Sequence, residues 1–307
     1  MLDNFASHLD VMAPQNGNSV TPTGVLRLFS IGLKVILADF KKYDLIFIGG
    51  LPQFIVPIVR MRAGRKTLII DFFISVYDTL VYDRMLLSSS NPMSRVLRWF
   101  DAYALFAADH VIVDTRRHGR YFCETFKSDP AKVTVLYLEA DKKIYYPKKV
   151  QRPPELGSKF LVFFFGAMNP LQGTEIILES ARILEKHGNI VFIIVGPFEK
   201  IKGIDRYLGL TNVRFAARWL PQSEIADLIA ASDLCLAGHF NETVEKASRV
   251  IPGKAFAYRA MDKPVIFGDN PANRELFHPE AKQVHFVKMG DPAALADKIL
   301  ELEGGGL

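Results

Sequence analysis

The chain alternates short, wholly apolar runs with longer stretches in which apolar residues recur every three or four positions. The short runs, rich in Val, Ile and Phe, predict buried strands, and the periodic stretches predict helices that cover a sheet. In the first half we predict strands at residues 44–48, 67–71, 110–114 and 133–137, a shorter strand at 11–13, and helices at 25–40 and 93–106. Strands that alternate with helices favour parallel sheets joined by crossover helices.

The same alternation restarts in the second half. Residues 146–154 are rich in proline and basic residues, which predicts a linker. Beyond it we predict strands at residues 160–165, 190–195, 233–236, 265–267 and 285–287, and helices at 174–185 and 292–302. We therefore expect an α/β protein with two Rossmann-like domains, residues 1–150 and 151–307, facing a central cleft. Residues 1–10 resemble the end of a helix. By comparison with the family whose resemblance is described below, this start implies that the first domain lacks its first strand–helix unit.

Composition places the chain among cytoplasmic globular proteins. It has 307 residues, of which 49% are hydrophobic, enough for two cores of ordinary size. The two cysteines, Cys123 and Cys235, lie far apart among apolar residues, which indicates reduced thiols rather than a disulfide framework. There is no apolar run of the roughly 18 residues that a membrane span needs, and no signal-peptide pattern at the start.

The net charge of +5 is concentrated in the first half, where residues 1–155 carry 21 lysines and arginines against 15 aspartates and glutamates. Nucleic acid is not an expected partner, because no zinc spacing, RNA-binding aromatic signature or basic run longer than two residues is present. An ordinary solvated basic surface and docking to an anionic membrane surface both remain open.

Several well-known catalytic motifs are absent from the sequence. It contains no phosphate-binding Walker loop, G-x-S-x-G elbow, H-E-x-x-H pair or G-x-G-x-x-G dinucleotide fingerprint. These absences disfavour a Rossmann oxidoreductase. Histidines and carboxylates show no metal-ligand spacing, so we predict neither a metal nor a cofactor.

The most suggestive local feature is the helix predicted from Pro252. Proline suits the first turn of a helix, and Gly253 and Lys254 follow it. Free N–H groups and the helix dipole make such a start a receptive site for anions. A lysine there opposes the dipole, so a helix with only a structural role would sooner carry Asp or Glu. The position therefore makes a phosphate site as plausible as an ordinary helix start.

Other candidate residues follow the predicted strands of the second half. They are Gly166, Gln172 and Gly173, then Gly196 and Pro197, Arg218 beside Trp219, His239, and Glu245 with Lys246. Each has a simpler reading as part of a turn or an exposed side chain. Because strand-end loops of a parallel sheet meet at one edge, we expect these residues to converge.

The order of these motifs resembles the family 4 glycosyltransferases of the GT-B fold. The motifs are residues 165–173, 195–197, 221–225 leading to 231–233, and 252–258 with 263–265, and the likeness spans nearly all of residues 158–303. The resemblance implies a nucleotide-sugar donor in the second domain, an acceptor in the first, and transfer with retention and without a metal. It also implies that Lys254 meets the donor diphosphate, that Gly166 and Gly173 line the donor cleft, and that Tyr258 packs behind the helix.

The chain departs from the family pattern at three positions. The family usually has glutamates at the positions of Arg249 and Ala257, and often a lysine at the position of Gln172. These departures put the donor identity and the activity in question. Arg249 or Lys246 is a candidate to supply the missing charge.

The first domain offers a looser set of acceptor-side candidates. Gly49 and Gly50 follow the strand at 44–48, and Asp71, Asp78 and Asp83 surround the end of another, with His118 as a possible neighbour. A carboxylate or imidazole there could orient an acceptor hydroxyl. Helix caps and surface ion pairs are the alternative reading.

Three hypotheses follow. The first is a retaining glycosyltransferase acting on a lipid-linked or polysaccharide acceptor of cell-surface glycan synthesis, at the inner membrane face, with Lys254, Arg249 and Asp78 as catalytic candidates. The second is a non-catalytic GT-B-like binding or scaffold subunit. The third, a two-domain nucleotide-sugar epimerase, is disfavoured because no acid/base pair is evident.

Overall fold

The computed structural model describes residues 33–306 except residues 85, 218 and 282. The strand expected at 11–13, the first half of the helix expected at 25–40, and Arg218 lie outside the described residues. Residues 33–37 are helical. No helix of the described part is long and apolar enough to cross a membrane.

The first sheet has four parallel strands in chain order: β1 (Leu45–Ile48), β2 (Thr67–Asp71), β3 (His110–Val113) and β4 (Val133–Val135). Their positions confirm the four predicted strands to within two residues. Helices α2 (Val56–Ala63), α3 (Val76–Asp78), α4 (Pro92–Ala107) and α5 (Arg116–Phe126) accompany the sheet, and α3 runs on into a wider turn, η4 (Thr79–Asp83). Leu68, Ile70, Val111 and Val113 are fully buried between them.

The second sheet has six parallel strands in the order β10-β9-β8-β5-β6-β7. Their bounds are β5 (Phe160–Phe165), β6 (Ile190–Val195), β7 (Val213–Ala216), β8 (Leu234–Gly238), β9 (Val265–Gly268) and β10 (Val284–Val287). From β5 the chain winds outward through β6 to β7, then returns to the middle and winds the other way from β8. This is the doubly wound order, in which ligands bind at the switch point between the two central strands, here β5 and β8.

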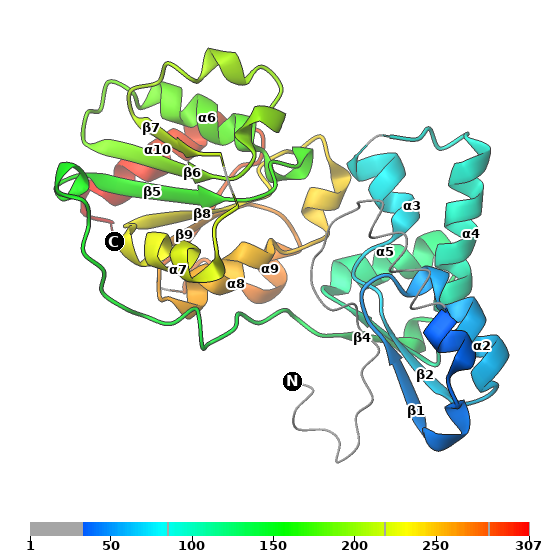
Figure 1. Ribbon diagram of the computed structural model, residues 1–307. Helices are drawn as coiled ribbons and strands as arrows, with labels where there is room; N and C mark the ends of the chain where they lie inside the picture. The colour runs from blue at the N-terminus through cyan, green and yellow to red at the C-terminus, as the bar shows by residue number, and fades with distance from the viewer. Residues whose placement is uncertain (1–32, 85, 218, 282, 307) are drawn as a thin grey trace.

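Helices cover both faces of the second sheet (Figure 1). One face packs against α6 (Thr174–Ile183) and α10 (Pro292–Glu301), with Ile177, Leu178 and Leu295 completely buried. The other face carries α7 (Gln222–Ala231), α8 (Gly253–Ala260) and the short α9 (Asn273–Leu276). Burial on both faces explains why β5 is apolar at every position.

β7 was missed by the sequence reading. It pairs with β6 along its whole length, but Arg214 interrupts its apolar pattern and Val213 is its one buried residue. A short edge strand needs little burial, so its sequence carries little strand signal.

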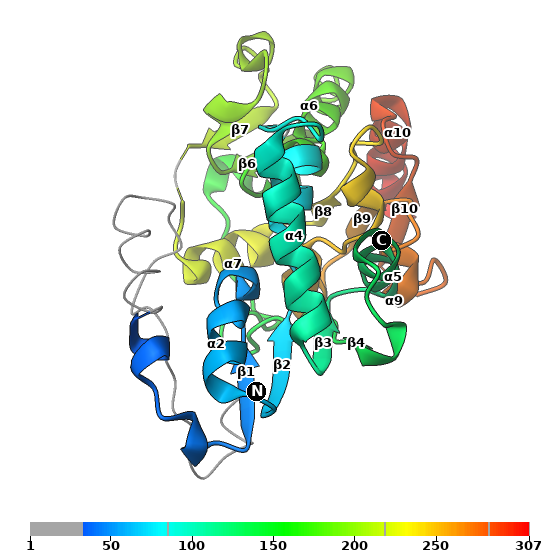
Figure 2. The ribbon, with the colours of Figure 1, turned by 90° about the vertical axis from the view of Figure 1, so that its right-hand side faces the viewer.

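The two sheets form separate lobes, which Figure 1 shows side by side, and Figure 2 shows α4 running along the first lobe. The chain passes between the lobes through residues 136–159, where the one regular element is the short turn η6 (Pro154–Leu156). Further short turns are η2 (Phe40–Lys42), η3 (Pro52–Phe54), η5 (Pro130–Lys132), η7 (Pro170–Gln172), η8 (Phe198–Lys200), η9 (Ile204–Arg206), η10 (Glu245–Ser248) and η11 (Leu302–Gly306). Cys123 and Cys235 are both free thiols.

Candidate active site

The strand-end loops of the second lobe converge at the switch point, as expected. Gly173, at the start of α6, has a φ of +66°, and a Cβ there would lie 2.7 Å from the backbone nitrogen of Asn241, in the loop after β8. A Cβ on Gly196, after β6, would fall on the carbonyl oxygen of Gly166, after β5. The loops therefore touch backbone to backbone, which only glycine allows at these positions.

Gln172 holds this glycine loop together. Its side-chain oxygen accepts a hydrogen bond from the Met168 amide at 3.1 Å, and the amide group lies across Gly166, leaving no room for a Cβ. At the position where the resembled family often has a lysine, this chain therefore has a neutral side chain that closes the loop on itself.

Lys254 is a buried cation at this switch point. Pro252 is the N-cap of α8, one position before the first turn in which we expected it, and Lys254 lies in that first turn. The lysine side chain is 9% exposed, and its Nζ lies 4.2 Å from the centre of the Phe164 ring and close to Gly238. Within the described residues, Nζ has no hydrogen-bond partner and no carboxylate within ion-pair distance.

Burial lowers the pKa of Lys254 to about 7. An ammonium group taken out of water without a partner is unfavourable, and the helix start adds positive potential of its own. Both penalties would be relieved by an anion. Lys254 is thus a candidate anion site, at which a bound ligand would supply the missing negative charge.

His239 lies next to Lys254 as a neutral polar group. It adopts a left-handed backbone conformation (φ +57°), and its Nδ1 lies 3.2 Å from the Val250 carbonyl oxygen. Because a carbonyl can only accept, Nδ1 carries the hydrogen and Nε2 is left as an acceptor. Burial, with the nearby charge of Lys254, lowers the pKa of His239 to about 3. The imidazole therefore serves as a fixed hydrogen-bonding group and not as a cation.

The remaining donor-side candidates around α8 have supporting positions. The ring of Tyr258 is fully buried and meets Phe163 and Phe165 edge-on, so it packs behind the helix and does not reach a ligand. Pro197 is buried behind Gly196, and Gly253 is exposed at the helix start. Ala257, at one family glutamate position, is buried in the apolar core.

The catalytic candidates Arg249 and Asp78 are brought together, but across the two lobes. Arg249 Nη2 donates to Asp78 Oδ1 at 3.0 Å, and both side chains are buried. The guanidinium carbon stacks 3.5 Å from the centre of the Tyr121 ring, and the Tyr121 hydroxyl donates to the same Asp78 oxygen at 2.9 Å. Arg249 Nε and Nη1 are buried without a partner among the described residues.

Lys246 belongs to the same interface. Its Nζ lies 3.3 Å from the Thr79 hydroxyl and 3.4 Å from Asp83 Oδ2, both in the first lobe. Both cations therefore already face carboxylates of the first lobe, and the expectation that one of them replaces the lysine missing at Gln172 stays a prediction. Glu245 lines a cavity of the first lobe described below, while its turn η10 also contacts η7 in the glycine loop.

A second contact between the lobes uses a helix start. Glu275, in α9, accepts hydrogen bonds from the backbone amides of Arg116 and Arg117 at 2.8 Å each, at the N-terminus of α5. The Thr115 hydroxyl, in turn, donates to the Arg249 carbonyl oxygen at 2.5 Å. A carboxylate is favoured at a helix N-terminus, so Glu275 ties the lobes together by capping a helix of the other lobe.

The acceptor-side candidates divide into two groups. Asp71, at the end of β2, lies near Gly49, and burial together with the neighbouring Asp114 raises its pKa. His118 Nδ1 lies 2.7 Å from Asp114 Oδ1, and its Nε2 is buried without a partner among the described residues. Asp78 and Asp83 belong instead to the lobe interface, so the expected single cluster of three aspartates is wrong.

Asp114 is a site residue that the sequence reading missed. It stands at the end of β3, four positions before His118, a spacing that places two side chains on one face of a helical turn. That spacing was the available signal. Gly50, with a φ of +83°, takes the turn after β1, and nothing lies within 4 Å of its Cβ position. No three His, Cys, Asp or Glu side chains in the described part of the chain gather so as to hold a metal ion.

The second lobe matches a known protein family. Residues 159–303 match the family Glycosyl transferases group 1. The match covers the second lobe, including the glycine loops, His239 and Lys254.

The other similarities extend over both lobes. The chain is 23% identical over 262 residues to the probable glycosyltransferase WbjE of Pseudomonas aeruginosa, covering 78% of this chain and 63% of that protein. Anabaena Alr3699/HepE, solved in complex with UDP and glucose, has a TM-score of 0.64 at 18% identity, covering 92% of this chain and 74% of that one. A UDP-forming α,α-trehalose-phosphate synthase from Burkholderia vietnamiensis has a TM-score of 0.63 at 16% identity, covering 92% and 69%. The fold is therefore GT-B, and the matches together support a glycosyltransferase.

Proposed function

We propose that the protein transfers a hexose from a nucleotide sugar to a glycan or lipid-linked acceptor, with retention of configuration, in the synthesis of a cell-surface glycan. The observation that carries the proposal is Lys254, a buried cation without a counter-ion at the switch point of the family-matching lobe. Retention follows from the family resemblance. The UDP complexes of HepE support a uridine diphosphate sugar as donor.

In the proposed reaction, Lys254 and the first turn of α8 stabilise the charge that grows on the departing diphosphate. Fixed dipoles and a desolvated cation are effective there because they need no reorganisation as the bond breaks. The glycines at 166 and 173 let the backbone approach the donor closely. Asp71, at the end of β2 in the first lobe, is the proposed group for orienting an acceptor hydroxyl.

The decisive experiment measures transfer from a panel of nucleotide sugars, together with calorimetric binding of UDP. Lys254→Met retains the volume of the side chain and removes the cation, so binding and transfer should both fall by at least about tenfold. Lys186→Met, at an exposed lysine before β6, is the matched control and should behave as wild type. Unchanged UDP binding in Lys254→Met would refute the proposed role.

The second candidate is a GT-B protein that binds nucleotide or a partner without catalysis. It is favoured by Ala257 and Arg249, which replace the glutamates of the resembled family with an apolar and a basic residue. UDP binding that depends on Lys254, combined with no transfer from any donor in the panel, would select this candidate. Absence of UDP binding would reject the donor site itself.

A further inference from the structure

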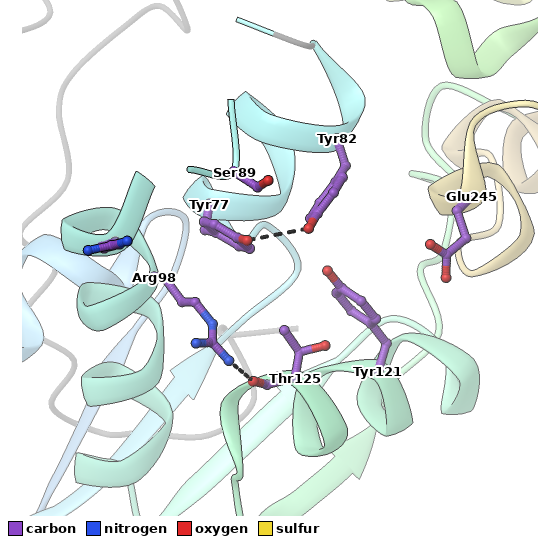
Figure 3. A pocket seen from close by; sticks show the side chains of 8 residues that line it. Tyr77, Tyr82, Ser89, Arg98, Tyr121, Thr125 and Glu245 are labelled. Atoms are coloured by element: carbon purple, nitrogen blue, oxygen red, sulfur yellow. Dashed lines mark hydrogen bonds between the residues drawn. The ribbon is translucent and has the colours of Figure 1, made fainter. Parts of the chain in front are cut away.

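A cavity of about 460 Å³ lies in the first lobe, away from the glycine loops. Figure 3 shows Tyr77, Tyr82 and Tyr121 around it, Arg98 from α4 at one side, and Glu245 of the second lobe at the other. The cavity shares Tyr121 and Glu245 with the boundary between the lobes, and the proposed donor site does not account for it.

The tyrosines give the cavity amphipathic walls. The hydroxyls of Tyr77 and Tyr82 lie 3.4 Å apart, and burial raises the pKa of Tyr77 and of Tyr121 to about 12. These two phenols therefore stay neutral. Tyr121 is shared with the contact between the lobes, where Arg249 lies on its ring and its hydroxyl donates to Asp78, so the exposed Tyr82 is the most accessible aromatic wall of the cavity. Such walls suit a sugar ring, which has apolar C–H faces and hydroxyls around its edge.

Two arginines mark one end of the cavity. Arg95 and Arg98 are three residues apart on α4, so their side chains leave the same face of the helix. Arg98 Nη2 donates to the Thr125 carbonyl oxygen at 2.8 Å, which fixes the guanidinium and leaves its other N–H groups available. Arg95 makes no hydrogen bond or ion pair with any described residue. Paired guanidinium groups are well suited to phosphate, which they can bind through two parallel hydrogen bonds.

The same arginines border a second cavity of about 360 Å³. Apart from Arg95, Arg98 and Thr125, which it shares with the first cavity, its walls come mainly from Trp99, Ala102 and Phe126. Trp99 is 55% exposed and stacks on Tyr103 at 5.4 Å. The arginines thus stand at the junction of a tyrosine-lined cavity and an apolar one.

We propose that these two cavities form the acceptor site for an amphiphile in which a phosphate or diphosphate joins a sugar to an apolar chain. The sugar occupies the tyrosine cavity, the phosphate meets Arg95 and Arg98, and the apolar chain lies along Trp99 and Phe126. This proposal rests on the proposed glycosyltransferase function and selects a lipid-linked acceptor over a polysaccharide. Glu245, contributed by the donor lobe, places the sugar cavity at the boundary between the lobes.

Binding of farnesyl diphosphate, inorganic diphosphate and farnesol to the full chain, without donor, tests the proposal. Farnesyl diphosphate should bind at least about tenfold more tightly than either of the other two compounds, because only it meets both the arginines and the apolar cavity. The double variant Arg95→Gln/Arg98→Gln should weaken the binding of farnesyl diphosphate at least about tenfold. Trp99→Ala should weaken the binding of farnesyl diphosphate and leave the binding of inorganic diphosphate unchanged. Arg62→Gln, an exposed arginine on α2, is the matched control.

Lys254→Met separates this site from the donor site. It should weaken UDP binding at least about tenfold and leave farnesyl diphosphate binding unchanged. Loss of farnesyl diphosphate binding in Lys254→Met but not in Arg95→Gln/Arg98→Gln would place the compound in the donor site and overturn the proposal. Equal affinity for inorganic and farnesyl diphosphate would also overturn it. Unchanged UDP binding in Lys254→Met would instead refute the proposed donor site, whatever the result with farnesyl diphosphate.

Discussion

Binding of a nucleoside diphosphate should make this protein take up a proton. Burial lowers the pKa of Lys254 to about 7, so at pH 8 roughly nine in ten molecules carry a neutral amine. A diphosphate in contact with Nζ stabilises the ammonium form and returns its pKa toward the ordinary value of 10.5. Each binding event at pH 8 should therefore take up about 0.9 proton.

The uptake has a defined pH profile. It should fall to about 0.5 proton at pH 7 and to about 0.1 at pH 6, because the free protein is then increasingly protonated already. By linkage, UDP affinity should decline above pH 7 and approach a tenfold loss for each further pH unit. His239 adds little to this profile, since its pKa is about 3.

Isothermal titration calorimetry of UDP at pH 8 in two buffers of different ionisation enthalpy measures the proton count directly. The phosphates of UDP are themselves ionised at this pH, because the second phosphate pKa is about 6. Lys254→Met should lose the uptake along with most of the affinity, whereas Lys186→Met should retain both. Tight UDP binding by the wild type without proton uptake would refute the account of Lys254 as a buried neutral amine that a phosphate recharges.

Three further predictions concern stability. Lys254→Met should stabilise the free protein at pH 7 by up to about 4 kcal/mol in urea denaturation. Between pH 7 and 10.5 the folded protein binds fewer protons than the unfolded chain. The stability that the wild type loses by burying the Lys254 ammonium is therefore largest below pH 7, and the difference in unfolding free energy between the two proteins should shrink as the pH rises to 10. Arg249→Glu sets a carboxylate against Asp78 and should cost about 3–5 kcal/mol, much of it recovered by adding Asp78→Asn. A destabilisation below about 1 kcal/mol would show that this bridge is not buried in solution. Gly173→Ala should destabilise by more than 2 kcal/mol and abolish UDP binding, whereas Gly50→Ala, with open space around its Cβ position, should cost only about 1 kcal/mol. Similar losses in the two glycine variants would contradict the close backbone packing at residue 173.

The sequence was informative wherever the determinant was local. Fully apolar β5 and β6 were predicted to their exact bounds because burial on both faces forbids polar residues along them. We could predict that the glycine loops converge, because parallel strands end at the same edge of a sheet. The unusual lysine at a helix start drew attention to Lys254, because its charge opposes the helix dipole. β7 was not predicted, because an edge strand tolerates a polar residue such as Arg214 and so lacks a continuous apolar pattern.

Contacts between the lobes could not be predicted in the same way. Asp78 and Arg249 are separated by 171 residues, and nothing in the local sequence of either distinguishes a buried ion pair from a surface charge. Glu275 reads as an ordinary residue of a short helix until the fold sets it against the amides that begin α5. Such pairs depend on how two complete lobes pack against each other. Sequence periodicity predicts helices and strands, but it does not predict contacts between lobes.

The pairing of Arg249 changes how its departure from the family pattern should be understood. If a glutamate had simply been lost, an unpaired guanidinium in a buried position would destabilise the protein by several kcal/mol. Instead the guanidinium has Asp78 opposite it, Tyr121 beneath it and the Thr115 hydroxyl on its backbone carbonyl. The first lobe therefore supplies the counter-charge that an arginine here requires, and a glutamate would be repelled by it. Arg249 is therefore part of the contact between the two lobes, where Asp78 balances its charge. In the proposed donor site, Lys254 is the cation that lacks a counter-ion among the described residues.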